Sequence, residues 1–475
     1  MYTIVKKKTT LLVKFVEKST KRVETVVRER IVIHNNKNMS TTDANVASKS
    51  ESETPNSAPD AAASATPAAA RQIPDWLKAD LFVDLLKKNV PDFKAIRSFD
   101  ANPAQGAGEN YATLMALVQL ELELITGKTK QISYMLKIPI EAVMKLMMGD
   151  NIFDVESNIY RQVIPELEQL YRDAGVEVTF SPQYFELQTP SEFGVILMED
   201  LRQRGFKNAN RLEGFDMEHT KCALKKLAQW HATSAVRVET KGKYPKIVSS
   251  GIFTEEFLAA MKPMHLASIK LFNECVRTYD GHEAYMDSMQ RTQEHIFDDF
   301  RAMIDADPTE FNVLNHGDFW ANNIMFQYDA FGKIKETYFV DFQCSRYGSP
   351  VHDLYNLLLS STQYEIKLKH FDYFIKYYHD QLIECLKLLR YPKKLPALKD
   401  IHIALYKYGV WGLAAASGHM AIVLLDPTES ASIENLLGNT PDAVEFKKLM
   451  YTNKRYRKHA EAVLPWLHNR GAFEM

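Results

Sequence analysis

The chain has 475 residues, of which 46% are hydrophobic and 25% are charged. This length exceeds the size of a single hydrophobic core and predicts two or three packed units, and the composition is that of a globular protein. The formal net charge of −2 gives no overall attraction to nucleic acid or to an anionic membrane. We therefore expect no nucleic-acid partner.

The cysteines and the most apolar stretch indicate a protein of a reducing compartment without a membrane span. Cys222, Cys275, Cys344 and Cys385 lie far apart, without the spacing of a zinc site or a disulfide framework. The stretch at 408–425 contains His419 and three glycines, so a buried helix is expected there. A cytoplasmic protein without an obligate protein partner is the prediction.

Residues 1–72 are predicted to be a tail that precedes the globular part. Residues 1–34 carry nine Lys or Arg against three Glu, and charge interrupts their apolar runs, which argues against a secretory signal. A mitochondrial transit peptide is the less favoured alternative, because such peptides are poor in acidic residues and rich in Ser. Residues 40–70 contain no aromatic residue and no Leu, Ile or Met, so a disordered linker is expected.

Residues 73–198 are predicted to form a small β-rich lobe. An amphipathic helix is expected at 73–88, followed by strands at 94–104, 114–124 and 131–139 and a strand pair around 176–188. The turn between the first two strands contains Gly106 and Gly108, whose backbone could approach phosphate oxygens closely. A plain hairpin turn is the alternative for this loop.

Lys137 stands within the otherwise apolar third strand. It either faces solvent on the alternating pattern or points inward, where its charge must be paired. The inward interpretation pairs it with Glu156 in a helix predicted over 150–165, with Asp154 and Glu166 as competing acids. Such a pair would hold the ammonium group where it can contact nucleotide phosphates.

The apolar strand at 193–201 runs into an acidic break and is predicted to connect two lobes. Its backbone groups at Glu199 and Leu201 would be available to an adenine edge, although Glu199 and Asp200 could instead cap the following helix. Residues 199–475 are then predicted to form a larger lobe, with amphipathic helices at 217–236, 254–279 and 286–304.

The segment 310–343 contains Asp318 and Asn323, five residues apart in a loop, and then Asp341 at the end of a predicted hairpin. All three side chains could converge at one edge of that hairpin. Carboxylate and amide oxygens suit Mg²⁺, which usually binds few protein ligands together with substrate phosphates. Phosphoryl transfer needs this set of groups, with one carboxylate facing the attacking hydroxyl.

The motifs "HGDFWANN" and "VDFQ" resemble the catalytic loop and metal-binding aspartate of the aminoglycoside phosphotransferase and choline kinase-like superfamily. Together with "GAGENYAT", "FDVESNIYRQVIP", "ILMEDL" and "LAQWHATSA", they more closely resemble the ecdysteroid kinase-like family of insects, over about residues 75–430. The resemblance implies an α+β, two-lobed protein kinase-like fold, with an antiparallel β-rich N-lobe and a mainly helical C-lobe. It also implies the cofactors ATP and Mg²⁺.

The resemblance implies a role for each matching residue. Asp318 would be the catalytic aspartate, Asn323 and Asp341 the magnesium ligands, and Lys137 the phosphate-contacting lysine with Glu156 as its partner. The loop with Gly106, Gly108 and Asn110 would cover the phosphates, and the connector with Glu199 and Leu201 would hold adenine. His316 would be a structural member of the catalytic loop, and Asp353 would brace that loop or cap a helix.

The short distance from Asp341 to Asp353 bears on the substrate class. Only eleven residues separate them, which leaves no room for the long activation segment of protein kinases. A small hydroxylated molecule is therefore the expected acceptor, in a pocket shaped by the helices at 254–304, 363–388 and 398–425. Aromatic residues there would line this pocket or belong to the core, namely Phe253, Phe257, Tyr355, Tyr406, Tyr408 and Trp411.

Three functions compete within this interpretation. The first is phosphorylation of a lipophilic metabolite such as an ecdysteroid, and the second is detoxification of xenobiotic or dietary alcohols by the same chemistry. The third is a pseudokinase that binds nucleotide or ligand without turnover, which the intact metal-binding set disfavours.

Overall fold

The computed structural model describes residues 73–104, 113–140 and 151–474. The predicted tail at 1–72 and the glycine loop with Gly106, Gly108 and Asn110 lie outside these residues.

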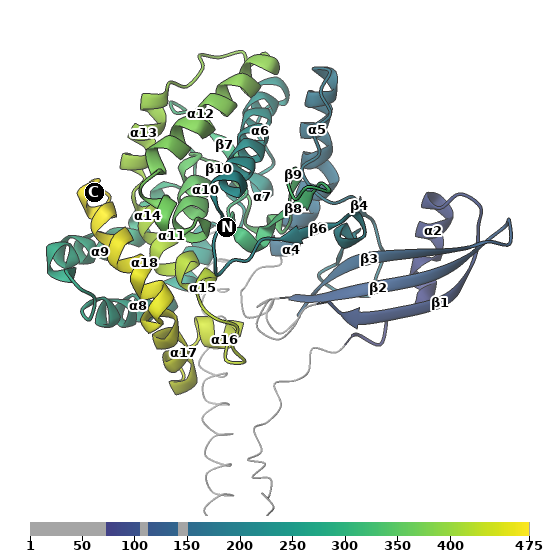
Figure 1. Cartoon of the computed structure of the whole chain (residues 1–475), viewed down its shortest axis with the longest axis horizontal. Coiled ribbons are helices and arrows are strands. Elements are labelled where there is room, and N and C mark those ends of the chain that lie inside the picture. Colours follow the sequence, from purple (N-terminus) through teal and green to yellow (C-terminus); the bar gives the residue numbers. More distant parts are fainter. Residues whose placement is uncertain (1–72, 105–112, 141–150, 475) are drawn as a thin grey trace, which may run out of the picture. The chain divides into compact units, whose positions relative to one another are not determined.

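An antiparallel sheet forms the N-terminal part, with the strand order β1-β2-β3-β5-β4 (Figure 1). Buried and less buried side chains alternate along β2, which pairs with β1 on one side and with β3 on the other. The elements of this part are η1 (Ala79–Phe82), α2 (Val83–Asn89), β1 (Phe93–Pro103), β2 (Thr113–Leu124), β3 (Thr129–Pro139), β4 (Tyr184–Phe185) and β5 (Ile196–Glu199).

Two details of the N-terminal prediction were wrong. The first helix begins at Ala79 rather than near Pro74, and the strand pair expected around 176–188 is reduced to the two residues of β4. Pro182 lacks the N–H that a ladder needs. Phe180 N–H instead donates to the Glu168 carboxylate at 3.1 Å, and Phe180 O accepts from Phe339 N–H at 2.7 Å.

The helical segment between β3 and β4 belongs to a different hydrophobic core. It consists of α4 (Asn151–Asn158), the π-helical η2 (Ile159–Val163) and α5 (Ile164–Asp173). Phe153, Leu167 and Tyr171 on this segment are buried in the cluster that also contains Trp230, whereas the sheet packs on Phe82 and Leu86. The helix that carries Glu156 is thus fixed by packing against the C-terminal part.

The C-terminal part is mainly helical, so the predicted α+β, two-lobed kinase-like fold is confirmed. Its longer helices are α6 (Met217–Lys241), α8 (Glu255–Val276), α9 (Met286–Ala302), α12 (Phe371–Leu388), α13 (Leu398–Lys407), α17 (Pro441–Thr452) and α18 (Lys454–Asn469). Its shorter helices are η3 (Leu201–Arg204), α7 (Lys246–Ser250), η4 (His282–Ala284), α10 (Val351–Tyr355), η7 (Asn356–Ser361), α11 (Tyr364–Lys367), α14 (Val410–Ala414), η8 (Ala415–His419), α15 (Met420–Val423) and α16 (Ile433–Leu437).

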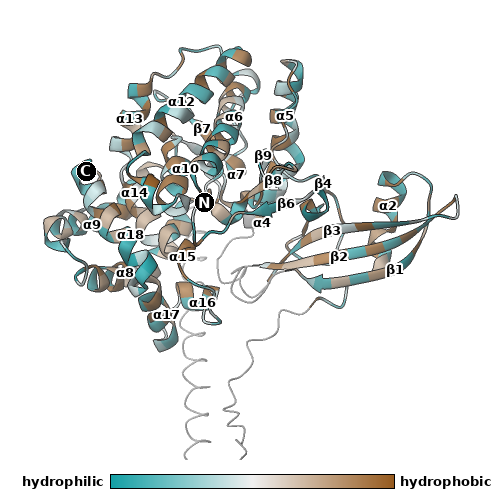
Figure 2. Cartoon of the chain, viewed as in Figure 1, coloured by the Kyte–Doolittle hydropathy of each residue, from teal (hydrophilic) through white to brown (hydrophobic). Residues whose placement is uncertain are grey.

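Amphipathic patterning places these helices around one core. Figure 2 shows hydrophobic and hydrophilic residues alternating along α12. The side chains that this helix buries recur at helical spacing, and include Phe371, Phe374, Tyr378 and Leu382. In the described part of the chain, no helix is both long and apolar enough to cross a membrane.

Two small sheets carry the segment with the predicted catalytic residues. One joins β7 (Val313–Asn315) to β10 (Arg346–Gly348), and the other has the order β6-β8-β9. The members of the second sheet are β6 (Phe206–Asn208), β8 (Ile324–Tyr328) and β9 (Ile334–Phe339), with η5 (Ala321–Asn323) before β8 and η6 (Phe342–Cys344) after β9. The loop after β7 and the end of β9 are therefore held close together.

Candidate active site

Lys137 lies at the centre of a buried polar cluster. Its side chain is 3% exposed, and its Nζ lies 2.7 Å from Glu156 Oε2 and 2.7 Å from Gln343 Oε1. It also forms an ion pair with Asp341 Oδ1. The lysine thus joins β3, α4 and the segment after β9, and the predicted pair with Glu156 is present.

The two competing acids are excluded as partners. Asp154 is exposed, and Glu166 instead accepts from Arg237 Nε at 2.8 Å. Burial alone would lower the pKa of Lys137, but the carboxylates of Asp341 and Glu156 outweigh that effect and raise it. Burial raises the pKa of Glu156, although Lys137 acts in the opposite direction. The cluster therefore holds a charged ammonium group away from water.

Asp341 adopts a backbone conformation that is uncommon for a residue with a side chain. Its φ is +73°, in the left-handed region, directly after β9. This turn sends the following Phe342 into the core and aims the Asp341 carboxylate at Lys137. Such strain persists only where the surrounding structure holds it, and it is concentrated at functional sites.

The loop after β7 depends on a glycine. Gly317 has φ +83°, and a Cβ at this position would lie 1.9 Å from Cys344 O. Only glycine fits both the conformation and the contact. The loop can therefore pass directly against η6, which follows Asp341.

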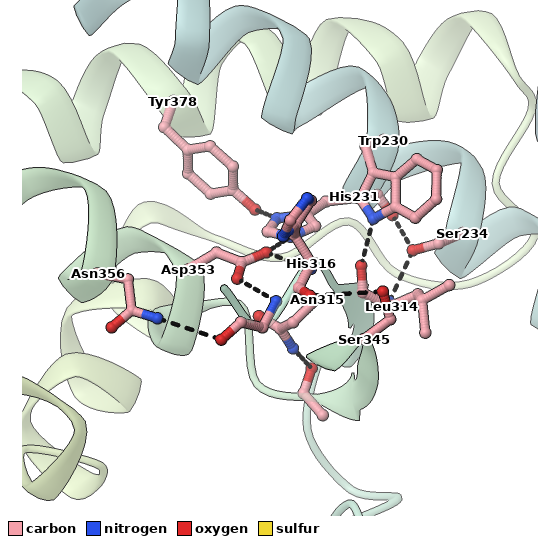
Figure 3. Close-up of polar contacts among 12 residues, drawn as sticks. Trp230, His231, Ser234, Leu314, Asn315, His316, Ser345, Asp353, Asn356 and Tyr378 are labelled. Carbon is pink, nitrogen blue, oxygen red and sulfur yellow. Dashed lines mark hydrogen bonds and ion pairs between the residues drawn. The ribbon is translucent and has the colours of Figure 1, made fainter. Parts of the chain in front are cut away.

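Asp353 braces this loop through hydrogen bonds to its backbone (Figure 3). Its carboxylate accepts from the backbone N–H of His316 at 2.7 Å and of Gly317 at 2.9 Å, and His231 Nε2 lies 3.2 Å away. Asp353 is the third residue of α10 and is fully buried, so it does not cap that helix. Burial would raise its pKa, but the hydrogen bond from His231 and nearby histidine charge hold the pKa below its usual range.

The side chain of Asp318 is held at both oxygens. Asn323 Nδ2 donates to Oδ2 at 3.0 Å and to the Asp318 carbonyl at 2.8 Å. His419 Nε2 lies 3.0 Å from Oδ1. Burial would raise the pKa of Asp318, but the hydrogen bond from His419 and the nearby His316 more than offset it, so the pKa lies below its usual value.

Asn323 and Asp341 approach each other through the backbone. Val340 N–H donates to Asn323 O at 3.1 Å, which ties the loop to the end of β9. Because Asn323 uses its Nδ2 on Asp318, its Oδ1 remains for another partner. No group of three or more His, Cys, Asp or Glu side chains gathers as a metal site in residues 73–104, 113–140 and 151–474. A magnesium ion that binds few protein ligands does not need such a group.

The connector between the two parts is fixed by Asp200. Its carboxylate accepts from Arg202 N–H at 3.2 Å, which caps η3, and from Ser133 Oγ at 2.8 Å. Glu199 N–H already donates to Gln183 O at 2.8 Å, and the Glu199 side chain pairs with Arg204 at 3.2 Å. Capping is thus the role of Asp200 rather than of Glu199. Leu201 opens η3 and is buried.

A comparison with protein families identifies the chain. The profile of the ecdysteroid kinase-like family matches residues 107–391, which contain all the site residues described above except His419. The chain belongs to the ecdysteroid kinase-like family. No curated protein matches the chain.

Membership of the ecdysteroid kinase-like family agrees with the arrangement of the predicted residues. The structure brings together Lys137, Glu156, Asp341, Asp318 and Asn323, and it places Glu199 and Leu201 on the connector. Gly106, Gly108 and Asn110 lie outside the described residues, so their role stays a prediction.

Sequence analysis missed two contacts of the ecdysteroid kinase-like site. Gln343 directly follows Asp341 and Phe342 in the quoted "VDFQ" motif, so its contact with Lys137 had a local signal. His419 had none, because 101 residues separate it from Asp318 and it lies in an apolar helical stretch.

The aromatic residues considered for an acceptor pocket do not act as one group. Tyr355 and Trp411 are buried core residues, and Tyr406 is 54% exposed. Phe253 packs edge-on against both Phe257 and Trp411. Tyr355 and Trp411 therefore belong to the core and Tyr406 to the surface, whereas Phe253, Phe257 and Tyr408 are half-buried.

Proposed function

We propose that this chain is an ATP- and Mg²⁺-dependent phosphotransferase that phosphorylates a hydroxyl group of a small lipophilic metabolite, with ecdysteroids as candidate acceptors. The observation that carries the proposal is the position of Lys137, buried between Glu156 and Asp341, while Asp318 stands on the adjoining loop. This is the set of groups that phosphoryl transfer requires.

Asn323 and Asp341 fit a magnesium ion. Asn323 uses its Nδ2 for hydrogen bonds to Asp318, so its Oδ1 is available to a metal ion. The Asp341 side chain is 23% exposed, and one of its carboxylate oxygens pairs with Lys137. Both are hard oxygen ligands of the kind that Mg²⁺ prefers. Mg·ATP, when bound, supplies the phosphoryl group and neutralises the charge that develops on its oxygens.

Side chains of the protein carry out the other steps of the reaction. Lys137 would donate a hydrogen bond to a phosphate oxygen, and Glu156 on α4 would hold the ammonium group of Lys137 in place for that contact. Asp318 orients the acceptor hydroxyl and takes its proton as the new P–O bond forms and the bond to the leaving ADP oxygen breaks. The lowered pKa of Asp318 keeps its carboxylate ionised and ready to accept.

The segment from Asp341 to Asp353 supports a small acceptor. It is occupied by η6, by β10 paired with β7, and by the start of α10 at Val351. No long activation segment interrupts these elements, and such a segment is what positions peptide substrates in protein kinases. The acceptor is therefore a small molecule that enters beside Asp318.

A metabolite panel tests this proposal. The purified full-length chain is incubated with Mg·ATP and ecdysteroids, dietary alcohols or plant glycosides, and phosphorylated products are measured by mass spectrometry. We expect a product with at least one alcohol and none after chelation of Mg²⁺. Preference for ecdysteroids indicates hormone metabolism, and preference for xenobiotic alcohols indicates detoxification. Thermal stabilisation by nucleotide without any product would contradict the proposal and indicate a pseudokinase.

A further inference from the structure

His419 contacts Asp318 from a helix that none of the recognised motifs includes. The hydrogen bond joins His419 Nε2 to Asp318 Oδ1 over 3.0 Å, and the side chain of His419 is 31% exposed. An ionised carboxylate only accepts hydrogen bonds, so Nε2 must carry a proton in this contact. The imidazole therefore acts as a donor to the carboxylate that faces the acceptor.

The other oxygen of Asp318 is held by its own loop. Asn323 is five residues away in sequence, so its bonds fix the carboxylate relative to the loop and not relative to the rest of the C-terminal part. His419 is the contact that ties the carboxylate to a distant helix. Without it, Oδ1 could turn about the side-chain torsions of Asp318, which are broad for this residue type.

The helix that carries His419 is held firmly. Its π-helical segment η8 ends at His419, and Ala415, Ala416 and Met420 are fully buried. Tyr456 Oη donates to Ala416 O at 3.0 Å, and Ser417 Oγ donates to Leu413 O at 2.8 Å. Single π-helical turns inside α-helices occur frequently at functional sites.

A second π-helical segment, η7, packs on η8 and also contacts the catalytic loop. Ala321 N–H donates to Ser361 Oγ at 2.9 Å, and Asn356 Nδ2 donates to Gly317 O at 3.4 Å. The backbone of the loop thus rests on η7, while the Asp318 side chain is held by η8. Both segments depart from regular helix where they meet the loop.

We infer that His419 is a positioning residue of the phosphotransferase, which holds the Asp318 carboxylate in the orientation that receives the acceptor hydroxyl. The inference rests on the proposed function for its kinetic consequence. His419 acts through Asp318, so its loss reduces turnover and leaves the nucleotide contacts of Lys137 and Asp341 unchanged.

Three substitutions distinguish hydrogen bonding from packing. His419→Leu keeps the bulk and removes the donor, and a charge-assisted hydrogen bond of this kind corresponds to a loss in kcat of roughly 10- to 100-fold. His419→Gln places an amide nitrogen near the position of Nε2, and we expect kcat within about threefold of wild type. His295→Leu is the matched control, because His295 is exposed on α9 away from the site.

The measurements are kcat, KM for ATP and crystal structures of the His419 variants. We expect His419→Leu to lower kcat with an unchanged KM for ATP, and its Asp318 carboxylate to adopt a second orientation that His419→Gln does not show. Wild-type kcat in His419→Leu with an unmoved carboxylate overturns the inference, as does an equal loss of kcat in both variants. If the wild type phosphorylates no alcohol, the proposed function fails, and the orientation of Asp318 in the crystal structures still decides the inference.

Discussion

Removal of the Lys137 ammonium group should destabilise the protein strongly, because it leaves a buried carboxylate without a partner. Glu156 is 0% exposed and lies 2.7 Å from Lys137 Nζ. Breaking a buried pair in this way costs about 3–5 kcal/mol. We therefore expect Lys137→Met to lower the free energy of unfolding by that amount, measured by chemical denaturation.

Replacing Glu156 as well should restore most of the lost free energy of unfolding. Lys137→Met with Glu156→Leu replaces the two fully buried charges by apolar groups of similar size, which is often neutral for stability, and leaves Asp341, whose side chain is 23% exposed. We expect the double variant to lie within about 2 kcal/mol of wild type, while phosphotransferase activity stays absent. Lys376→Met is the matched control, because Lys376 and Asp380 form an ion pair that is exposed on both sides, and the cost should be below about 1 kcal/mol.

The stability of the Lys137→Met variant should fall as the pH rises. Burial already raises the pKa of Glu156, and loss of Lys137 removes the largest interaction that lowers it. The folded-state pKa then lies above the unfolded value, so the folded protein binds the proton more tightly and stability falls as the pH rises. We expect Lys137→Met to be more stable at about pH 5 than at about pH 8. A Lys137→Met variant as stable as wild type, or no recovery in the double variant, would refute this account of the pair.

Three further substitutions test the supports of the site. Gly317→Ala should sharply reduce the yield of soluble, folded protein, because its Cβ would lie 1.9 Å from Cys344 O. Gly418→Ala is the control, with nothing within 4 Å of its Cβ, and should melt at the wild-type temperature. Equal melting temperatures of the two variants would contradict this expectation. Asp353→Asn replaces the carboxylate that receives two backbone N–H groups, so we expect denaturation to show a loss of about 2 kcal/mol and assays to show a lower kcat. Asp200→Ala removes the cap of η3 and should lower the free energy of unfolding by about 1 kcal/mol. It should also raise KM for ATP more than it changes kcat. An unchanged KM would show that the connector does not contribute to nucleotide binding.

Features that are defined by residues close together in the sequence could be predicted. The strands β2 and β3 follow from their alternating and β-branched residues, and Asp318, Asn323 and Asp341 are recognisable because they share one short segment. The Lys137–Glu156 pair could be predicted because a charge within an apolar strand requires a nearby partner.

Contacts between distant segments could not be predicted in the same way. The expected strand pair around 176–188 does not form, because the Phe180 backbone bonds to the Glu168 side chain and to Phe339 N–H, and because Pro182 has no N–H to donate. His419 meets Asp318 at the end of the π-helical η8, and no periodicity in the apolar stretch signals that contact. The brace from Asp353 to the catalytic loop was anticipated by family resemblance, and its geometry decides against a capping role.

We propose that Asp318 directs phosphoryl transfer from Mg·ATP to a small alcohol. The most direct measurement is kcat for the best acceptor in wild type, Asp318→Asn and the exposed control Asp287→Asn, with ATP binding measured on the same preparations. We predict that Asp318→Asn retains ATP binding and loses at least about 100-fold in kcat, whereas Asp287→Asn behaves as wild type. An Asp318→Asn variant that phosphorylates the acceptor at the wild-type rate would contradict the account.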